Sequence, residues 1–169
     1  MYFSKSTLEV AEALVHAAWA KGLTIATAES CTGGLIAAAI TEVPGASDVF
    51  MRGFVTYANE AKTDLLGVPE ALLAQFGAVS EEVARAMAEG ALGAADADIA
   101  VSATGVAGPG GGSEAKPVGL VYMAASVRGG ATLHERAVFS GDRQAVRAQA
   151  VETALALLRQ QAETAPARG

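Results

Sequence analysis

Apolar side chains recur every three or four residues in several stretches of the chain, and short, continuously apolar runs lie between these stretches. Residues 5–20 have the helical spacing, which predicts an amphipathic helix that ends at Gly22. The run at residues 24–28 predicts a buried strand, and residues 35–40 predict a second helix after a turn of small residues. The chain therefore opens with a helix, a strand and a helix.

The same alternation continues through the middle of the chain. Residues 50–57 predict a strand, and residues 59–66 predict a helix that Gly67 stops. Pro69 opens another short helix. Ser80 is followed by two acidic residues, which is typical of a helix N-terminus and predicts a helix through about residue 95.

The last third of the chain combines one more buried strand with a hairpin. Residues 98–103 predict the strand, and residues 118–127 and 132–139 predict an antiparallel pair joined by a glycine-containing turn. A final helix is predicted after Asp142, which can cap it.

Helices that alternate with strands, together with one hairpin, indicate an α/β protein. We expect a three-layer α/β/α single domain around a mixed sheet, occupying residues 1–162. Residues 163–169 are polar and small, and are expected to form a frayed C-terminal tail.

Composition and charge narrow the class of protein. A chain of 169 residues is long enough for one domain with a sizeable core. The apolar content of 51% includes 39 alanines, yet it is too high for a disordered chain. A formal net charge of −6 argues against electrostatic binding to the phosphate backbone of DNA or RNA, so no nucleic-acid partner is expected.

Few residues in the chain could form disulfides or bind metals. A single cysteine, Cys31, excludes an internal disulfide, and His16 and His134 are too few for an imidazole metal site. We therefore expect neither a metal nor a cofactor. The chain shows no signal-peptide pattern and no apolar run long enough to span a bilayer, which predicts a cytoplasmic protein without a membrane partner.

Small polar residues follow the first predicted strand, at a place where α/β proteins bind ligands. Residues 30–34 supply two hydroxyls, one thiol and two glycines. If a helix began near Gly33, its free N–H groups would suit a phosphate or an oxyanion, and Ser30 could be a nucleophile. On spacing alone, a small-residue helix cap around a buried Cys31 is the simpler interpretation. A Cys31 thiol with a lowered pKa is an alternative nucleophile.

A glycine-rich segment follows the strand at residues 98–103. Residues 104–112 contain five glycines and one proline, so they cannot form regular structure. A flexible hairpin loop is one interpretation. Because the proline favours a fixed shape, we expect a ligand-binding loop instead.

A nucleophile at Ser30 would need a base. His16 and His134 are predicted to lie on a helix and a strand away from the loops, so a histidine triad is not expected. The remaining candidates are Lys62, Lys116 or a tyrosine. Lys62 lies one turn into a helix that follows Tyr57, and a desolvated lysine can act as a base directly or through a tyrosine hydroxyl. A solvated helix face is the commoner environment for a lysine.

Two cations lie one turn apart at the start of the last predicted helix. Arg143 and Arg147 have a spacing that suits a phosphate or carboxylate. Surface arginines beside an Asp142 cap explain the same pattern equally well.

Six segments, taken in order, resemble the C-terminal domain of the competence/damage-inducible protein CinA, including its stand-alone, PncC-type nicotinamide-nucleotide amidohydrolases. They are residues 28–34 (AESCTGG), 57–62 (YANEAK), 78–80 (AVS), 104–111 (TGVAGPGG), 116–119 (KPVG) and 141–143 (GDR). The resemblance covers about residues 8–158.

The resemblance implies an amidase that hydrolyses nicotinamide mononucleotide to nicotinic acid mononucleotide and ammonia, as part of pyridine nucleotide recycling. It implies a Ser30 nucleophile activated by Tyr57 and Lys62. The expected substrate-binding residues are Cys31, Thr32, Gly33, Gly34, Asn59, Thr104, Gly105, Ala107, Gly108, Gly110, Arg143 and Arg147.

The apolar content and the resemblance also predict a homodimer or a higher homo-oligomer. The alternative function is a non-catalytic nucleotide-binding or interaction module linked to competence or the DNA damage response.

Overall fold

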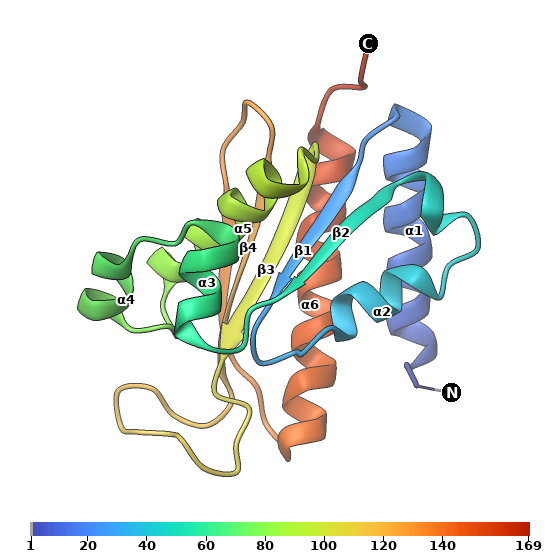
Figure 1. The fold of residues 1–169 in the computed structure, drawn as a ribbon. Helices are drawn as coiled ribbons and strands as arrows, with labels where there is room; N and C mark the ends of the chain where they lie inside the picture. The colour runs from blue at the N-terminus through green and yellow to red at the C-terminus, as the bar shows by residue number, and fades with distance from the viewer. Residues whose placement is uncertain (1) are drawn as a thin grey trace.

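The computed structural model describes residues 2–169 and contains three layers (Figure 1). In chain order the elements are α1 (Lys5–Lys21), β1 (Ile25–Glu29), α2 (Leu35–Thr41), the 3-10 helix η1 (Ala46–Asp48), β2 (Phe50–Val55), α3 (Asn59–Leu66), α4 (Glu70–Phe76), α5 (Glu81–Ala95), β3 (Ile99–Gly105), β4 (Leu120–Val127), β5 (Leu133–Val138) and α6 (Arg143–Thr164). The predicted α/β architecture is confirmed.

Within the described residues, the strands form one mixed sheet in the order β2-β1-β3-β4-β5. β1 pairs in parallel with both β2 and β3, whereas β4 and β5 are antiparallel. Glu29, the last residue of β1, is level with Val55 of β2 and Ala103 of β3. The three parallel strands therefore end together, at the lower edge of the sheet in Figure 1.

Helices cover both faces of this sheet. α1, α2 and α6 pack on one face and α3, α4 and α5 lie on the other (Figure 1). The larger core cluster joins α1, α2 and α6 to the sheet, and a smaller cluster lies under α3 and α5. All five residues of β1 are buried, because helices cover this strand on both faces.

The helix ends follow from the capping residues in the sequence. Ser80 and Asp142 each accept a hydrogen bond from the backbone N–H three residues further on, as predicted for N-caps. Gly22 and Gly67 adopt left-handed conformations that end α1 and α3.

Two predicted boundaries are wrong. β3 continues through Gly105, so the glycine-rich loop begins later than expected. α6 continues through Thr164, two residues into the segment that was expected to form the tail. The N–H of Arg168 donates to the Lys21 carbonyl at 2.8 Å, and its guanidinium lies 3.4 Å from the Asp98 carboxylate.

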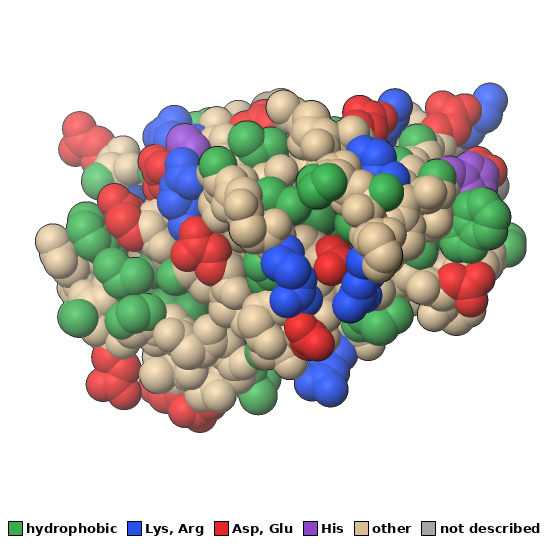
Figure 2. Space-filling model, turned by 90° about the horizontal axis from the view of Figure 1, so that it is seen from above, with side chains coloured by type: hydrophobic (Ala, Val, Ile, Leu, Met, Phe, Trp, Pro, Cys, Tyr) green, Lys and Arg blue, Asp and Glu red, His purple; other side chains and the backbone are tan. Residues whose placement is uncertain are grey.

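The end of the molecule that carries Asp98 is opposite the carboxyl ends of the parallel strands. Figure 2 views this end and shows acidic and basic side chains interspersed. Asp98 accepts from Arg128 at 3.3 Å as well as from Arg168. Within residues 2–169, no helix has the length and apolar character needed to cross a bilayer.

Gly90 marks the closest approach of α5 to α3, and it generates a stability prediction. A Cβ at this position would overlap the backbone carbonyl of Leu66. We expect Gly90→Ala to lower the free energy of unfolding by about 2 kcal/mol or more, because overpacking forces the helices apart. Urea unfolding followed by circular dichroism measures this change.

Gly93, one turn further along α5, provides the matched control. A Cβ there would meet no atom within 4 Å. Gly93→Ala should raise the free energy of unfolding by up to about 1 kcal/mol, the difference in helix propensity. Equal effects of the two substitutions would contradict the packing of α5 on α3 described here.

Candidate active site

The site lies where the three parallel strands end. Ser30 directly follows β1, Tyr57 comes two residues after β2, and Thr104 and Gly105 finish β3. Side chains from these ends border a pocket of about 290 Å³. It gathers most of the predicted site residues: Ser30, Cys31, Tyr57, Asn59, Lys62, Thr104, Gly105, Ala107, Gly108, Gly110 and Arg143.

Lys62 is the most unusual side chain of the pocket, because it is only 1% exposed. The first turn of α3 directs its Nζ to within 3.1 Å of Ser30 Oγ and 2.7 Å of the Thr56 carbonyl. The Tyr57 carbonyl lies 3.4 Å away. Burial lowers the pKa of Lys62, because the ammonium form loses its hydration. The solvated helix face considered for this lysine is therefore excluded.

The Tyr57 hydroxyl makes no hydrogen bond to Ser30 or Lys62 among the described residues, so a proton path through its phenol stays a prediction. Its side chain is 62% exposed, and its hydroxyl accepts from Arg143 at 3.2 Å. Arg143 also donates to the Gly108 carbonyl at 2.9 Å. The phenol and this guanidinium thus frame the mouth of the pocket, while Lys62 contacts Ser30 directly.

The turn after β1 has the simpler form that the spacing favoured, a cap of small residues around a buried Cys31, and not the alternative of an anion-binding helix start. α2 begins at Leu35, and the N–H groups of Gly34, Ile36 and Ala37 are not free. They donate to the buried carboxylate of Glu29 at 3.2, 2.9 and 2.8 Å. The start of α2 is therefore occupied by the protein's own carboxylate, which contradicts a phosphate or oxyanion role for these N–H groups.

Four predicted binding residues lie outside the pocket: Thr32, Gly33, Gly34 and Arg147. Arg147 donates from Nε to the Cys31 carbonyl and from Nη2 to the Thr32 carbonyl, both at 3.1 Å. The Thr32 hydroxyl is buried and has no partner among the described residues. These four residues shape the turn that carries Ser30.

The glycine-rich segment forms a wall of the pocket with a defined shape. The Thr104 hydroxyl donates to the Ala78 carbonyl at 2.8 Å. The N–H of Val106 donates to the Leu120 carbonyl at 2.8 Å, and the N–H of Gly119 donates to the Val106 carbonyl, also at 2.8 Å. Lys116 reaches the Phe76 carbonyl at the end of α4. These contacts support the fixed loop that the proline indicated.

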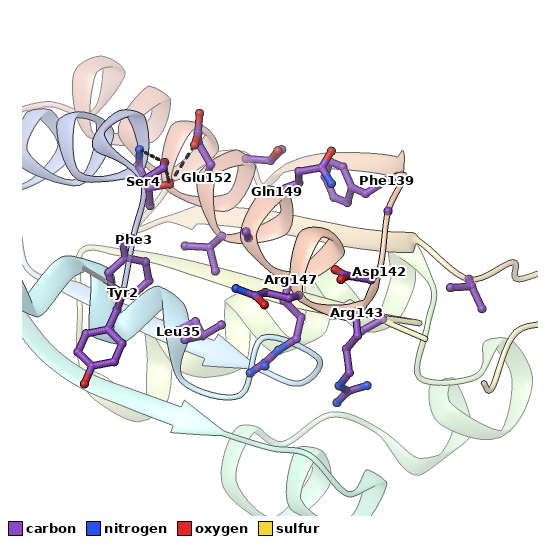
Figure 3. A pocket seen from close by; sticks show the side chains of 18 of the residues that line it. Tyr2, Phe3, Ser4, Leu35, Phe139, Asp142, Arg143, Arg147, Gln149 and Glu152 are labelled. Carbon is purple, nitrogen blue, oxygen red and sulfur yellow. Dashed lines mark hydrogen bonds between the residues drawn. The ribbon is translucent and has the colours of Figure 1, made fainter. Parts of the chain in front are cut away.

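A second, larger cavity of about 1150 Å³ adjoins the pocket. Ala107 and Arg143 line both. Figure 3 shows Arg143 and Arg147 projecting from the start of α6, with the aromatic rings of Tyr2 and Phe3 on the other side of the cavity. We call this cavity the α6 groove. Its lining includes the guanidinium groups of Arg143 and Arg147 and the carboxylates of Asp142 and Glu152.

Sequence reasoning missed several residues of the site. Ala78, Val79, Val106 and Gly111 also line the pocket, and the first two belong to a motif that was noted but not assigned to the site. Glu29 belongs to the motif at residues 28–34, but it was assigned no role from the sequence. Its signal is an acidic residue at the end of an otherwise apolar strand and just before a small-residue turn. No set of three His, Cys, Asp or Glu side chains within residues 2–169 could hold a metal.

Comparisons with known proteins agree with the geometry. The CinA C-terminal domain family model matches residues 7–162. The chain is 54% identical over 154 residues to nicotinamide-nucleotide amidohydrolase PncC of Escherichia coli K12, covering 91% of this chain and 93% of that protein. A CinA-like protein of Geobacter sulfurreducens is 57% identical over 86% of this chain, which spans 35% of that longer protein.

The fold is also similar to solved structures. The competence/damage inducible protein CihA from Agrobacterium tumefaciens has a TM-score of 0.89 and 49% identity, covering 90% of this chain and 93% of that one. A CinA superfamily protein from Escherichia coli has a TM-score of 0.87 and 39% identity, covering 91% and 89%.

The environment of Cys31 generates a reactivity prediction. Burial raises the pKa of its thiol to about 11, so the lowered pKa considered from the sequence is wrong. We expect iodoacetamide at pH 8 to alkylate the native protein at least about 100-fold more slowly than the urea-unfolded protein, because the thiolate is the reactive form. Mass spectrometry measures both rates on this single cysteine. Equal rates would contradict the burial.

Proposed function

The chain belongs to the CinA C-terminal domain family, and from this membership we propose that it is a nicotinamide-nucleotide amidohydrolase. It converts nicotinamide mononucleotide and water to nicotinic acid mononucleotide and ammonia, a step that returns nicotinamide nucleotides to pyridine nucleotide synthesis. The similarity to PncC over most of both chains supports the substrate.

The observation that carries the mechanism is the 3.1 Å contact between Ser30 Oγ and Lys62 Nζ in a buried environment. A neutral amine has two N–H groups and one lone pair. The carbonyls of Thr56 and Tyr57 can accept the two N–H groups, which leaves the lone pair for the Ser30 hydroxyl. Lys62 then acts as the general base without an intermediary.

In the first half of the reaction, Ser30 Oγ attacks the carboxamide carbon of the nicotinamide ring while its proton moves to Lys62 Nζ. The tetrahedral intermediate collapses when Lys62 returns that proton to the amide nitrogen. Ammonia leaves, and a nicotinoyl ester remains on Ser30.

In the second half, water attacks the ester carbon and gives one proton to Lys62. The bond to Ser30 Oγ breaks, Lys62 returns the proton to this oxygen, and the free carboxylic acid is released. The same pair of residues serves both halves, because Lys62 is neutral again after each one.

The nucleotide end of the substrate carries a phosphate, and we assign its recognition to Arg143. Arg143 lines both the catalytic pocket and the α6 groove. Its positive charge therefore lies at the border of the pocket, where the ribose phosphate of a bound substrate extends toward the groove. Tyr57, which is held by Arg143, contacts the substrate at the mouth of the pocket. Two of the donor groups of Arg147 are already used by the Ser30 turn.

Substitution of the nucleophile tests the proposal. We expect Ser30→Ala to reduce ammonia release from nicotinamide mononucleotide by at least about a thousand-fold, because the acyl-enzyme cannot form. Ammonia is measured with a coupled glutamate dehydrogenase assay, after treatment of the protein with EDTA.

Cys31→Ala is the matched control, since it removes the adjacent thiol and should retain most of the activity. Near-normal turnover by Ser30→Ala would overturn the mechanism. Binding of the nucleotide by the wild-type protein without ammonia release would favour the non-catalytic binding module instead.

The lowered pKa of Lys62 generates a pH prediction. The base acts only when neutral, so kcat/KM should rise with pH through the pKa of Lys62 and then level off. Because burial lowers that pKa from 10.5, the rise should be complete below the pH expected for an exposed lysine. Lys62→Arg keeps the positive charge at all accessible pH values and should be inactive across the profile. A profile that keeps rising beyond pH 10.5 would contradict this assignment.

A further inference from the structure

Glu29 is a buried carboxylate that takes no part in the reaction proposed above. It is the last residue of β1, directly precedes Ser30, and is 1% exposed. Its side chain turns away from the pocket, toward the start of α2. There Oε2 accepts from the N–H groups of Gly34 and Ile36, and Oε1 accepts from that of Ala37.

A buried carboxylate is costly unless several hydrogen bonds replace its water. Three charge-assisted bonds from backbone N–H groups meet that need, and the positive end of the α2 dipole adds to them. Glu29 therefore links the end of β1 to the start of α2 across the turn that carries Ser30. The residues on both sides of Ser30 are thereby fixed relative to each other.

Arg147 holds the same turn from the opposite side. Its guanidinium, carried by α6, donates to the carbonyls of Cys31 and Thr32. Glu29 thus takes up N–H groups at the end of the turn, while Arg147 takes up carbonyls at its centre. The turn itself adds a bond from the Gly33 N–H to the Ser30 carbonyl at 3.1 Å.

We propose that Glu29 is a positioning residue for catalysis, whose carboxylate holds the Ser30 turn so that Ser30 Oγ stays within reach of Lys62 Nζ. The inference rests on the proposed serine amidase reaction. Attack on an amide requires the reacting atoms to be aligned within about 0.5 Å, and such alignment is lost when a supporting side chain is left loose. Removal of the Glu29 contacts should therefore slow turnover more than it weakens substrate binding.

The test is Glu29→Gln, which keeps the size of the side chain but replaces one acceptor oxygen with a donor. We expect kcat to fall about 10- to 100-fold while KM changes less than about threefold. A merely structural role would lower the melting temperature without this split between kcat and KM. Unchanged kcat in Glu29→Gln would overturn the proposal.

Asp98→Asn is the matched control. Asp98 is also a buried carboxylate that accepts a backbone N–H, from Thr24 at 2.9 Å, but it precedes β3 at the other end of the sheet. The substitution Asp98→Asn should lower the melting temperature and leave kcat within about twofold of wild type. Equal losses of kcat in the two variants would contradict a positioning role and indicate general destabilisation.

Hydrogen exchange provides a readout that does not depend on the substrate. In Glu29→Gln, the amides of Gly34, Ile36 and Ala37 should exchange at least about tenfold faster than in wild type, relative to the sheet amides. No change at these amides would overturn the proposal. If the wild-type protein itself releases no ammonia, the proposed function fails, and these amides still decide whether Glu29 fixes the turn.

Arg147→Lys gives a second variant in case Glu29→Gln does not fold. Lysine keeps the positive charge but cannot donate hydrogen bonds to the Cys31 and Thr32 carbonyls with the bidentate geometry of a guanidinium. We expect kcat to fall about 5- to 10-fold, with faster exchange at the same turn. Wild-type kcat and exchange in this variant would contradict the view that contacts around the turn position Ser30.

Discussion

The reaction that we propose for this protein depends on the burial of a single amine. Lys62 lies beneath the ends of β1 and β2 with its Nζ against Ser30 Oγ, and it shares this position with two backbone carbonyls. An exposed lysine at neutral pH is charged and cannot accept a proton. Removal from water makes the neutral form accessible, so the same packing that completes the core on this side of the sheet also provides the base.

The parallel arrangement of β1, β2 and β3 brings the other parts of the site to this amine. Each strand ends at the same edge. The first is followed by the proposed nucleophile, the second by a carbonyl that contacts the lysine, and the third forms a wall of the pocket. The Ser30 turn is then held from two sides, by Glu29 and by Arg147. The pocket adjoins the α6 groove, into which we propose that the substrate extends.

Local patterns predicted most of the elements correctly because helix spacing, capping residues and glycine stops act within a few residues. Ser80 and Asp142 cap their helices as expected, and Gly22 and Gly67 end theirs. Local patterns gave no indication that Arg168, near the C-terminus, contacts Lys21 and Asp98, which lie far from it in the sequence. The alternative of an anion-binding helix start before α2 is excluded by a contact that local spacing did not indicate either. Local spacing indicated the unpaired N–H groups of a helix start, but gave no indication that Glu29 would fold back onto them.

The sequence by itself determined the α/β class, the mixed sheet, the single domain and, through its resemblance to a family, the identity of Ser30, Tyr57 and Lys62 as candidates. Only the tertiary structure decided how these residues work together. Ser30 and Lys62 are 32 positions apart, and Arg147 and Thr32 are 115 apart. Contacts over such separations depend on how strands and helices pack, and local propensity carries no information about them. The direct contact of Lys62 with Ser30, the pairing of Tyr57 with Arg143 and the contacts of Glu29 with the start of α2 were all decided by the tertiary structure.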